Sequence, residues 1–367
     1  NLEAVAAVRG TVLDGMQDRL DRYRSFRLFM DICVRCGACA DKCHFYLGSG
    51  DPRNTPVLRA ELLRSVYRRY FTAAGRMFGP LAGARDLTED VLKEWFYYFY
   101  QCTECRRCSV FCPYGIDTAE ITMIGRELLG LVGCTIQWVV EPAANCYRTG
   151  NHLGIQPHGF KDSLAFAAGE LEELTGIRID IPIDRKGAEV LLVVPSADYF
   201  GTPHYYTLLG YLMVLHEARV DYTFSAFASE GGNFGLFASH ELMKRLNAKI
   251  YDEARRLGVK WILGGECGHM WRVVHQYMGT MNAPAEFLEV PVSPVTGTRF
   301  DHAASTKMVH VCEFTADLLA HGRLRVDRSR NDHWTVTFHD SCNPARGMGL
   351  YEEPRAILRG VLNHFHE

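Results

Sequence analysis

The spacing of hydrophobic and polar residues predicts a helical first third of the chain. Apolar positions that recur every three to four residues after Pro56 predict a helix that begins there, because proline fits the first turn. Thr88 precedes Glu89 and Asp90, an arrangement typical of a capped helix start with acids in its first turn. A third helix is predicted over 117–131.

The pattern changes after residue 188, where short apolar runs alternate with helical stretches. The alternation predicts a parallel α/β sheet, in which ligands bind beyond the carboxyl ends of the strands. The predicted strands are 188–194, 220–224, 259–263 and 334–338, and the predicted helices are 204–217, 241–257 and 354–364.

Polar and thiol residues follow three of these strands. The first strand leads into Pro195-Ser196-Ala197-Asp198, and the third leads into Gly264-Gly265-Glu266-Cys267-Gly268-His269. The last leads into His339-Asp340-Ser341-Cys342-Asn343. These strand ends are therefore the first place to look for chemistry in the second half of the chain.

Composition restricts the class of protein. The chain has 367 residues, of which 47% are hydrophobic and 23% charged, as in soluble globular proteins of two or three domains. The net charge of −3 gives no basic field for nucleic acid. The first 30 residues lack the apolar stretch of a signal peptide, and the most apolar segment, 128–140, is shorter than the ~20 residues that span a bilayer. We therefore expect reduced thiols in a cytoplasmic protein.

Eight of the 13 cysteines lie in two runs with the same C-x2-C-x2-C-x3-C spacing, and a proline follows the second run. This is the spacing of bacterial two-cluster ferredoxins, in which the fourth cysteine of each run binds the other cluster. We therefore predict two [4Fe–4S] cubane clusters. The first is assigned to Cys33, Cys36, Cys39 and Cys112, and the second to Cys102, Cys105, Cys108 and Cys43.

Zinc is the alternative metal, but two zinc sites leave no role for the third cysteine of each run. Cations beside the ligands would favour the reduced clusters and raise their potentials, unless their side chains only reach water. These cations are Arg35, Lys42, Arg106 and Arg107. Neither predicted cluster has an open coordination site, so both are expected to relay electrons, and bond chemistry must occur elsewhere.

An internal repeat is predicted in the second half. The stretch from 334 restarts the stretch from 190 when Ser341 is aligned with Ser196. The second copy reaches only one strand and one helix before Glu367, too little to bury its faces. We therefore expect this chain to be a fragment, or the ordered part, of a longer polypeptide.

The cysteine runs followed by two such repeats resemble the heterodisulfide reductase catalytic subunit family (HdrD-like, with CCG domains). In that family each repeat carries a cysteine, a Cys-Cys-Gly and a C-x2-C that hold a noncubane [4Fe–4S] centre acting on disulfides. Matched to this pattern, the first repeat is degenerate at Ser196-Ala197 and at Glu230-Gly231-Gly232, and keeps only Cys267, with Met270 opposite. In the second repeat Cys342 matches the first cysteine, so a third, noncubane cluster would be completed beyond residue 367.

The resemblance implies a catalytic set near that centre, composed of Cys342, Cys312, Cys267 and His339. His269 and His310 are further candidates for proton donation to leaving thiolates. Small buried cysteines and structural histidines are the alternative for each of them, and the favoured interpretation of Cys134 and Cys146.

One degenerate and one intact repeat is similar to the DsrK subunits of DsrMKJOP sulfur-metabolism membrane complexes. This similarity implies an integral-membrane haem b cytochrome partner (DsrM-like), a small disulfide or trisulfide protein (DsrC-like) and a peripheral position on the cytoplasmic side of the membrane. The alternative is a pure electron relay, such as the iron–sulfur subunit of a flavin-dependent glycolate, lactate or glycerol-3-phosphate dehydrogenase.

The predicted class is α+β, with a helical ferredoxin domain before α/β CCG-type repeats. A basic aromatic surface for membrane docking is expected on the N-terminal helix together with Arg64, Tyr67, Arg68, Arg69, Tyr70 and Phe71. The alternative is a solvated basic face packed on the cluster domain. The predicted domains are 1–30 (N-terminal helix and docking segment), 31–134 (ferredoxin), 135–188 (connector), 189–300 (degenerate repeat) and 301–367 (start of the second repeat).

Overall fold

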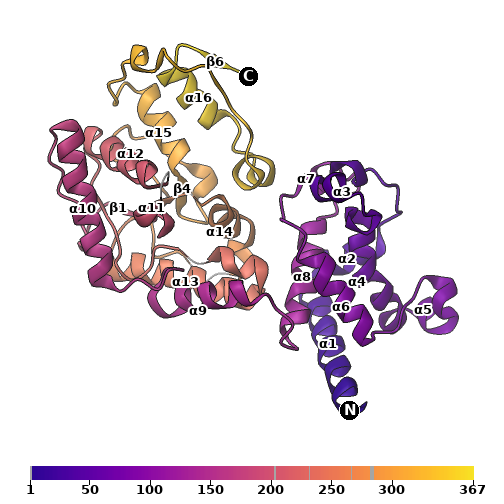
Figure 1. Ribbon diagram of the computed structural model, residues 1–367. Helices are drawn as coiled ribbons and strands as arrows, with labels where there is room; N and C mark the ends of the chain where they lie inside the picture. The colour runs from indigo at the N-terminus through magenta and orange to yellow at the C-terminus, as the bar shows by residue number, and fades with distance from the viewer. Residues whose placement is uncertain (1, 202–203, 231, 266, 282–284) are drawn as a thin grey trace. The chain divides into compact units, whose positions relative to one another are not determined.

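The computed structural model describes residues 2–201, 204–230, 232–265, 267–281 and 285–367. These residues form two compact units, and each is described by itself. The first unit comprises Asn1–Val139 together with Leu236–His240, and the second comprises Val140–Gly235 and Glu241–Glu367. The overall α+β class is confirmed (Figure 1).

The first unit is helical throughout its described part. Its α-helices are α1 (Leu2–Arg22), α2 (Arg24–Asp31), α3 (His44–Ser49), α4 (Pro56–Phe71), α5 (Ala73–Phe78), α6 (Glu89–Phe99), α7 (Arg107–Val110) and α8 (Thr118–Gly130). Short 3-10 turns are η1 (Ala40–Lys42), η2 (Pro52–Asn54) and η3 (Gly79–Ala82).

The helix starts predicted from the sequence are confirmed. α4 begins at Pro56, and Thr88 caps α6 by accepting the Val91 N–H at 3.3 Å. The Asp117 carboxylate caps α8 by accepting the Ala119 N–H at 3.0 Å. Each cap satisfies a backbone donor that the first turn of a helix leaves unpaired.

The N-terminal segment differs from the single docking helix that was expected. The helix is interrupted at Tyr23, whose backbone is extended (φ −111°, ψ 99°). Val12, Met16 and Leu20 are buried in the core of the first unit, so the apolar face of α1 is already covered. Burial of apolar surface is the physical reason that this helix packs on the first unit, whereas Arg22, Arg24 and Arg27 remain exposed.

The second unit alternates strands and helices. Its α-helices are α9 (Gln137–Thr149, which begins in the first unit), α10 (Pro157–Thr175), α11 (Ala197–Phe200), α12 (His204–Glu217), α13 (His240–Leu257), α14 (Gly268–Met281), α15 (Val311–Ala320) and α16 (Glu352–Val361). Its strands are β1 (Val190–Leu192), β2 (Tyr222–Thr223), β3 (Trp261–Gly264), β4 (Met308–His310), β5 (Val336–Thr337) and β6 (Phe365–His366). Shorter turns are η4 (Gly232–Phe237), η5 (Asp301–Ala303), η6 (Arg328–Asn331) and the π-helical η7 (Cys342–Gly347).

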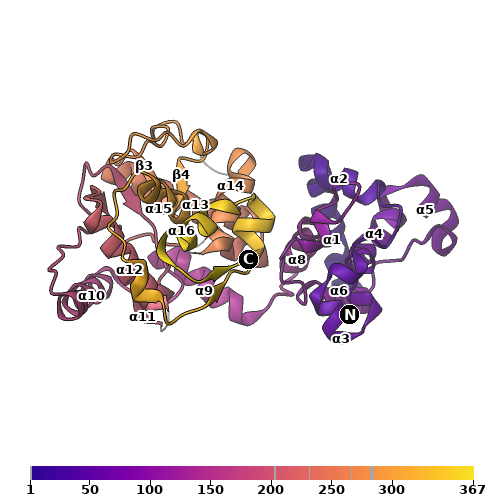
Figure 2. The same cartoon turned by 90° about the horizontal axis from the view of Figure 1, so that it is seen from above.

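The main sheet is parallel in the order β2-β1-β3-β4. Successive residues of β1 face opposite sides: Val190 and Leu192 belong to one hydrophobic core, and Leu191 and Val193 belong to the other. Helices α10 and α12 supply the first core, and α13 and α14 supply the second (Figure 2). Both faces of the sheet are therefore covered, as parallel sheets require.

Two of the expected boundaries are wrong. Residues 135–188 are more than a connector, because Phe160 and Leu164 of α10 are buried in the core against the sheet. The division between 300 and 301 also fails, since β4, which was not predicted, pairs with β3 and completes the first sheet. The expected strand at 334–338 instead forms a separate parallel pair, β5 with β6.

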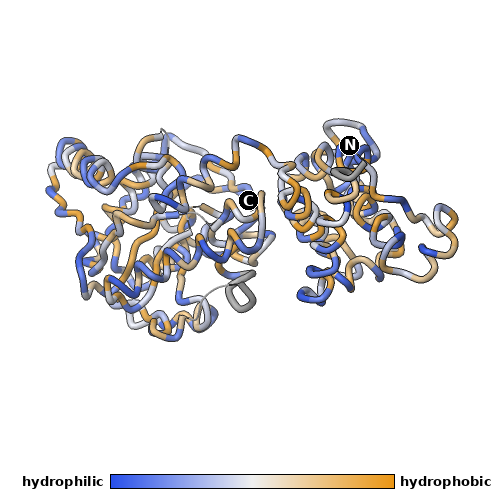
Figure 3. The backbone as a smooth tube through the Cα atoms, turned by 90° about the horizontal axis from the view of Figure 1, so that it is seen from below, coloured by the Kyte–Doolittle hydropathy of each residue, from blue (hydrophilic) through white to orange (hydrophobic). Residues whose placement is uncertain are grey.

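Hydropathy along the backbone follows this division, with apolar stretches on the inward sides of the helices of each unit (Figure 3). In the described part of the chain, no helix combines the length and the apolar character needed to cross a membrane.

Candidate iron–sulfur site

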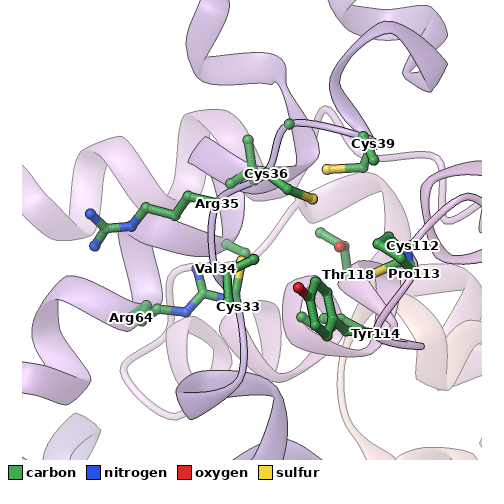
Figure 4. A pocket seen from close by; sticks show the side chains of 15 residues that line it. Cys33, Val34, Arg35, Cys36, Cys39, Arg64, Cys112, Pro113, Tyr114 and Thr118 are labelled. Carbon is green, nitrogen blue, oxygen red and sulfur yellow. The ribbon is translucent and has the colours of Figure 1, made fainter.

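Four thiols of the first unit line one hollow of about 430 Å³, here named the first hollow. They are Cys33, Cys36, Cys39 and Cys112, and Figure 4 shows their sulfur atoms turned toward a common space. The first three lie on the loop between α2 and α3, which reverses direction at Gly37 (φ +79°). That backbone conformation suits glycine because any side chain would strain it.

The other four thiols line a second hollow of about 340 Å³. They are Cys102, Cys105 and Cys108, from the loop that follows α6, together with Cys43, which directly precedes α3. Each hollow thus combines three cysteines of one run with the fourth cysteine of the other run. This crosswise arrangement is the one expected from the spacing.

The number of thiols in each hollow suits a cubane cluster. Each hollow is lined by four cysteines, three from one run and one from the other. This is the ligand set of a [4Fe–4S] cluster in two-cluster ferredoxins.

Burial and neighbouring thiols shift the pKa of two of these cysteines. Burial raises the pKa of Cys39, and the neighbouring Cys112 and Cys33 raise it further. Burial also raises the pKa of Cys108 well above its ordinary value, with a further contribution from Cys102. Such thiols are protonated at neutral pH unless a bound cationic metal stabilises their thiolate forms.

Three buried arginines beside the hollows were not predicted from the sequence. Arg64 lines the first hollow, and its Nε donates to the Met30 carbonyl at 3.0 Å. Arg59 lines the second hollow and donates to the Tyr98 carbonyl at 3.1 Å. Arg126 donates to the carbonyls of Phe99, at 2.7 Å, and of Cys102. In the sequence, burial of these three arginines is indicated only by their positions on the apolar faces of predicted helices.

Arg64 therefore does not belong to an exposed docking surface, and Tyr67 is also buried. Three of the four cations that the sequence singled out are paired with carboxylates: Arg35 with Glu61 at 2.8 Å, Lys42 with Asp41 at 2.9 Å and Arg106 with the buried Asp117 at 2.8 Å. Arg107 is exposed. Exposed cations contribute less to a buried cluster than the buried guanidinium of Arg59 does, because solvent screens them. Arg64 and Arg126 are buried but also paired, with Glu61 at 3.2 Å and with Glu104 at 3.0 Å.

The strand-end residues of the second unit are only partly brought together. Cys267 directly precedes α14, and Cys342 begins η7, which packs against the first turn of α14. A side chain at Gly268 would meet Pro344 at 2.7 Å, and Arg272 donates to Asn343 at 3.3 Å. The structure thus places the segments that contain Cys267 and Cys342 side by side.

Cys312 lies apart from them. It packs against the core on one face of the sheet, whereas Cys267 packs against the core on the other. Burial raises the pKa of Cys312 to about 12, so it is a protonated thiol at neutral pH. These two facts favour a small buried side chain over a catalytic one.

The histidines differ in the same way. His310 caps α15 by accepting the Cys312 N–H at 3.0 Å, and burial lowers its pKa to about 4, so it is a neutral capping group rather than an acid. Burial also lowers the pKa of His269. His339 is exposed, beside the Asp340–Arg355 ion pair.

A hydrogen-bonded cluster occupies the degenerate strand end after β1. Oε1 of Glu230 accepts from the Ser196 N–H at 3.1 Å, the Ser196 hydroxyl, the His152 N–H at 2.9 Å and His152 Nδ1 at 2.8 Å. Burial alone would raise the pKa of Glu230, but the bonds from His152 and Ser196 lower it overall. His152 lies in the segment that the sequence assigned to a connector. The neighbouring motif residues Gly231 and Glu266 lie outside the described residues.

Comparison with known proteins agrees with this geometry. The family model for a 4Fe-4S dicluster domain matches residues 29–116. The Hdr-like menaquinol oxidoreductase iron-sulfur subunit 2 of Archaeoglobus fulgidus is 54% identical over 372 residues, which cover 97% of this chain and 67% of the relative. A subunit of the dihydromethanophenazine:CoB–CoM heterodisulfide reductase of Methanosarcina mazei is 24% identical over 339 residues, or 90% and 73% of the two chains. The EtfAB:quinone oxidoreductase of Syntrophomonas wolfei is 23% identical over 95% of this chain and 46% of the relative.

The fold and the two thiol sets define an iron–sulfur protein that binds [4Fe–4S] clusters on a dicluster ferredoxin domain. The chain belongs to the family of iron–sulfur subunits of heterodisulfide-reductase-like (Hdr-like) oxidoreductases. The expected HdrD-like relationship is thereby confirmed, and the closer similarity to DsrK stays a prediction. No solved structure shows a significant match.

Proposed function

We propose that this chain is the electron-transfer subunit of a membrane-associated, quinone-linked oxidoreductase and holds two cubane clusters in its first unit. The observation that carries the proposal is the pair of hollows, each lined by four thiols drawn crosswise from both runs. The names of the relatives from Archaeoglobus fulgidus and Syntrophomonas wolfei, both quinone-linked oxidoreductases, support the quinone connection. When bound, such clusters pass one electron at a time.

The residues of the chain shape this role. The eight cysteines hold the two clusters, and the buried Arg59 keeps positive charge fixed beside the second hollow. Arg64 and Arg126 lie beside the hollows as buried ion pairs with Glu61 and Glu104. The exposed Cys36 marks the first hollow as the side from which a redox partner gains access. We further propose a membrane haem b cytochrome (DsrM-like) as the quinone-side partner, on the cytoplasmic face of the membrane.

The sulfur side of the proposal concerns Cys342. Reducing a disulfide consumes two electrons and two protons and releases two thiols, so the substrate must be held while single electrons arrive. We propose that Cys342 is one ligand of a noncubane centre beside the segment that contains Cys267. The substrate is a protein disulfide or trisulfide (DsrC-like). The proximity of η7 and α14 supports this assignment.

Metal analysis tests the first part of the proposal. Anaerobically prepared protein should contain about eight irons, and EPR after dithionite reduction should show two interacting cubanes. Zinc, or iron for a single cluster, would contradict it.

Replacement of single cysteines tests the second part. In the full-length polypeptide with its partner subunits, Cys342→Ser should abolish disulfide turnover and leave both cubanes reducible. Cys312→Ser is the matched control and should keep turnover, because Cys312 packs into the core. If Cys342→Ser retains disulfide turnover, the proposal that Cys342 takes part in the sulfur chemistry is contradicted.

A pure relay is the second candidate. The hydrogen-bonded Glu230 at a strand end without thiols, and the match to an EtfAB:quinone oxidoreductase, favour it. If the chain co-purifies with a flavoprotein and the complex shows no disulfide turnover, the relay is established. Co-purification with a membrane cytochrome b would favour the sulfur-active subunit.

A further inference from the structure

An apolar tip extends from the first unit between α4 and α6. The chain leaves the end of α4 at Phe71, forms α5 and η3, and returns before Thr88, as the projecting loop in Figures 1 and 2 shows. We define the apolar tip as Met77, Phe78, Pro80 and Leu81. The exposed fractions are 75% for Met77, 55% for Phe78 and 93% for Leu81.

The base of this loop is built rigidly. Thr72 caps α5 by accepting the Gly75 N–H at 3.1 Å. Gly75 packs so closely on α4 that a Cβ there would lie 1.9 Å from the Arg68 carbonyl oxygen. The Ala84 N–H donates to the Gly79 carbonyl at 3.1 Å, which closes the turn. The loop is therefore a defined projection that holds its apolar side chains away from the core.

An arginine lies directly beside the tip. The segment 68–86 contains four arginines and a single acidic residue, Asp86. Arg68 pairs with Glu61, Arg69 with Asp86 at 2.6 Å and Arg85 with Glu94 at 2.8 Å. No carboxylate among the described residues lies within ion-pair distance of Arg76, which is exposed directly beside Met77. An apolar end with adjacent positive charge matches the boundary between acyl chains and anionic headgroups.

Shape and size decide between a lipid and a protein as the occupant. A stable protein–protein interface buries about 800 Å² on each partner, spread over roughly 20 or more residues. The tip offers four residues on a convex projection, which would need a matching groove to bind a protein. A bilayer adapts to a convex apolar projection and needs no such groove.

We propose that the apolar tip inserts into the headgroup–acyl boundary of an anionic bilayer and orients the cluster-bearing unit at the membrane surface. This inference rests on the proposed function as a membrane-associated subunit and extends it by naming lipid as the direct partner of α5 and η3. It also relocates the basic docking surface expected around Arg64 and Tyr67, which are buried, to residues 76–81.

Vesicle sedimentation of the cluster-loaded chain tests the proposal. The protein should bind vesicles of phosphatidylcholine with phosphatidylglycerol, bind vesicles of phosphatidylcholine alone much less, and dissociate as salt is raised. Leu81→Glu should lower binding about tenfold, and Arg76→Gln about fivefold. The matched control is Leu174→Glu on α10, whose leucine is 62% exposed and lies outside the tip, and this variant should bind as the parent protein does.

Three results would overturn the proposal: no binding of the parent protein at low salt, equal binding of Leu81→Glu, or the same loss in Leu174→Glu. Binding only to vesicles that contain a partner membrane subunit would identify a protein as the occupant and would also overturn it. Iron content and dithionite reduction are measured on the same samples. If the protein has intact clusters but does not bind vesicles, only the proposed insertion of the apolar tip is refuted. If it binds vesicles but contains no iron, only the proposed electron-transfer function is refuted.

Discussion

Cys112 and Cys39 line the same hollow, although the two thiols belong to different cysteine runs. Burial raises the pKa of Cys39, and Cys112 is the nearby thiol with the largest further effect. A relationship between distant parts of the chain thus sets the ligand partition, and single replacements can measure it.

Crosswise ligation predicts how pairs of replacements combine. Cys112→Ser and Cys33→Ser should each remove about half of the iron, and the double variant should lose no more, because both residues serve one cluster. Cys112→Ser combined with Cys102→Ser should lose nearly all of it. Iron and sulfide analysis measures this, with Cys134→Ser, which lines neither hollow, as the control. Additive loss in the first pair would disprove the partition.

Arg126 is expected to tune the cluster of the second hollow. Its guanidinium is buried, donates to the carbonyl of Cys102 and pairs with Glu104 at 3.0 Å. Arg126→Met should lower the reduction potential of that cluster by on the order of tens of mV, because a fixed cation favours the reduced form. Arg126→Lys retains the charge and should lose less. An EPR redox titration measures both, and an unchanged potential in Arg126→Met would contradict the role.

Glu127 should make the first unit sensitive to acid. Burial alone would raise its pKa, but hydrogen bonds from His240 at 3.1 Å and from Arg19 at 3.2 Å lower it to about 2. The ordinary value is 4.5, so the stabilisation is complete above pH 4.5 and is lost as the pH falls toward 2. The loss amounts to about 3 kcal/mol.

The measurement compares the parent protein with Glu127→Gln in denaturant unfolding at several pH values. Their difference in unfolding free energy should be largest near neutral pH and shrink below pH 4.5. Because both proteins release iron in acid, the difference isolates the carboxylate. A difference that does not change with pH would show that Glu127 is not ionised in the folded chain.

Gly150 should be intolerant of any side chain. Its φ is +78°, and a Cβ would lie 1.8 Å from the Phe227 carbonyl oxygen, in the loop that brings His152 to Glu230. Gly150→Ala should therefore cost about 2–4 kcal/mol, through strain and displaced backbone. Gly176→Ala, with a φ of +72° and open space around the Cβ, is the matched control and should cost about 1 kcal/mol. Thermal unfolding of both variants tests this, and equal losses would show that the close approach to Phe227 is unimportant.

The local features of this chain could be predicted from its sequence. The helix start at Pro56, the cap at Thr88 and the loops that carry the cysteines depend on residues within one or two turns of each other. Cysteine spacing is equally local, because three thiols at steps of three residues already surround one side of a cube. Local spacing therefore predicts three thiols of each set, whereas the fourth comes from the distant run and was predicted from the two-cluster ferredoxin pattern.

Contacts between residues far apart in the sequence could be seen only in the tertiary structure. Leu236–His240 belongs to the first unit although it follows β2 of the second, and it brings His240 to Glu127. His152 reaches Glu230 from a segment that was expected to be a connector, and β4 joins the first sheet across the expected domain boundary.

Sequence by itself determined the two cysteine runs and the alternation of strands and helices, since each follows from short-range geometry. Tertiary structure decided which arginines are buried beside the hollows, which segments of the second unit lie side by side and which apolar residues stay exposed at Met77 to Leu81. The physical reason is that a buried charge needs hydrogen-bond or ion-pair partners, and an apolar side chain is buried only where other residues pack over it. Both depend on which distant residues the fold brings together.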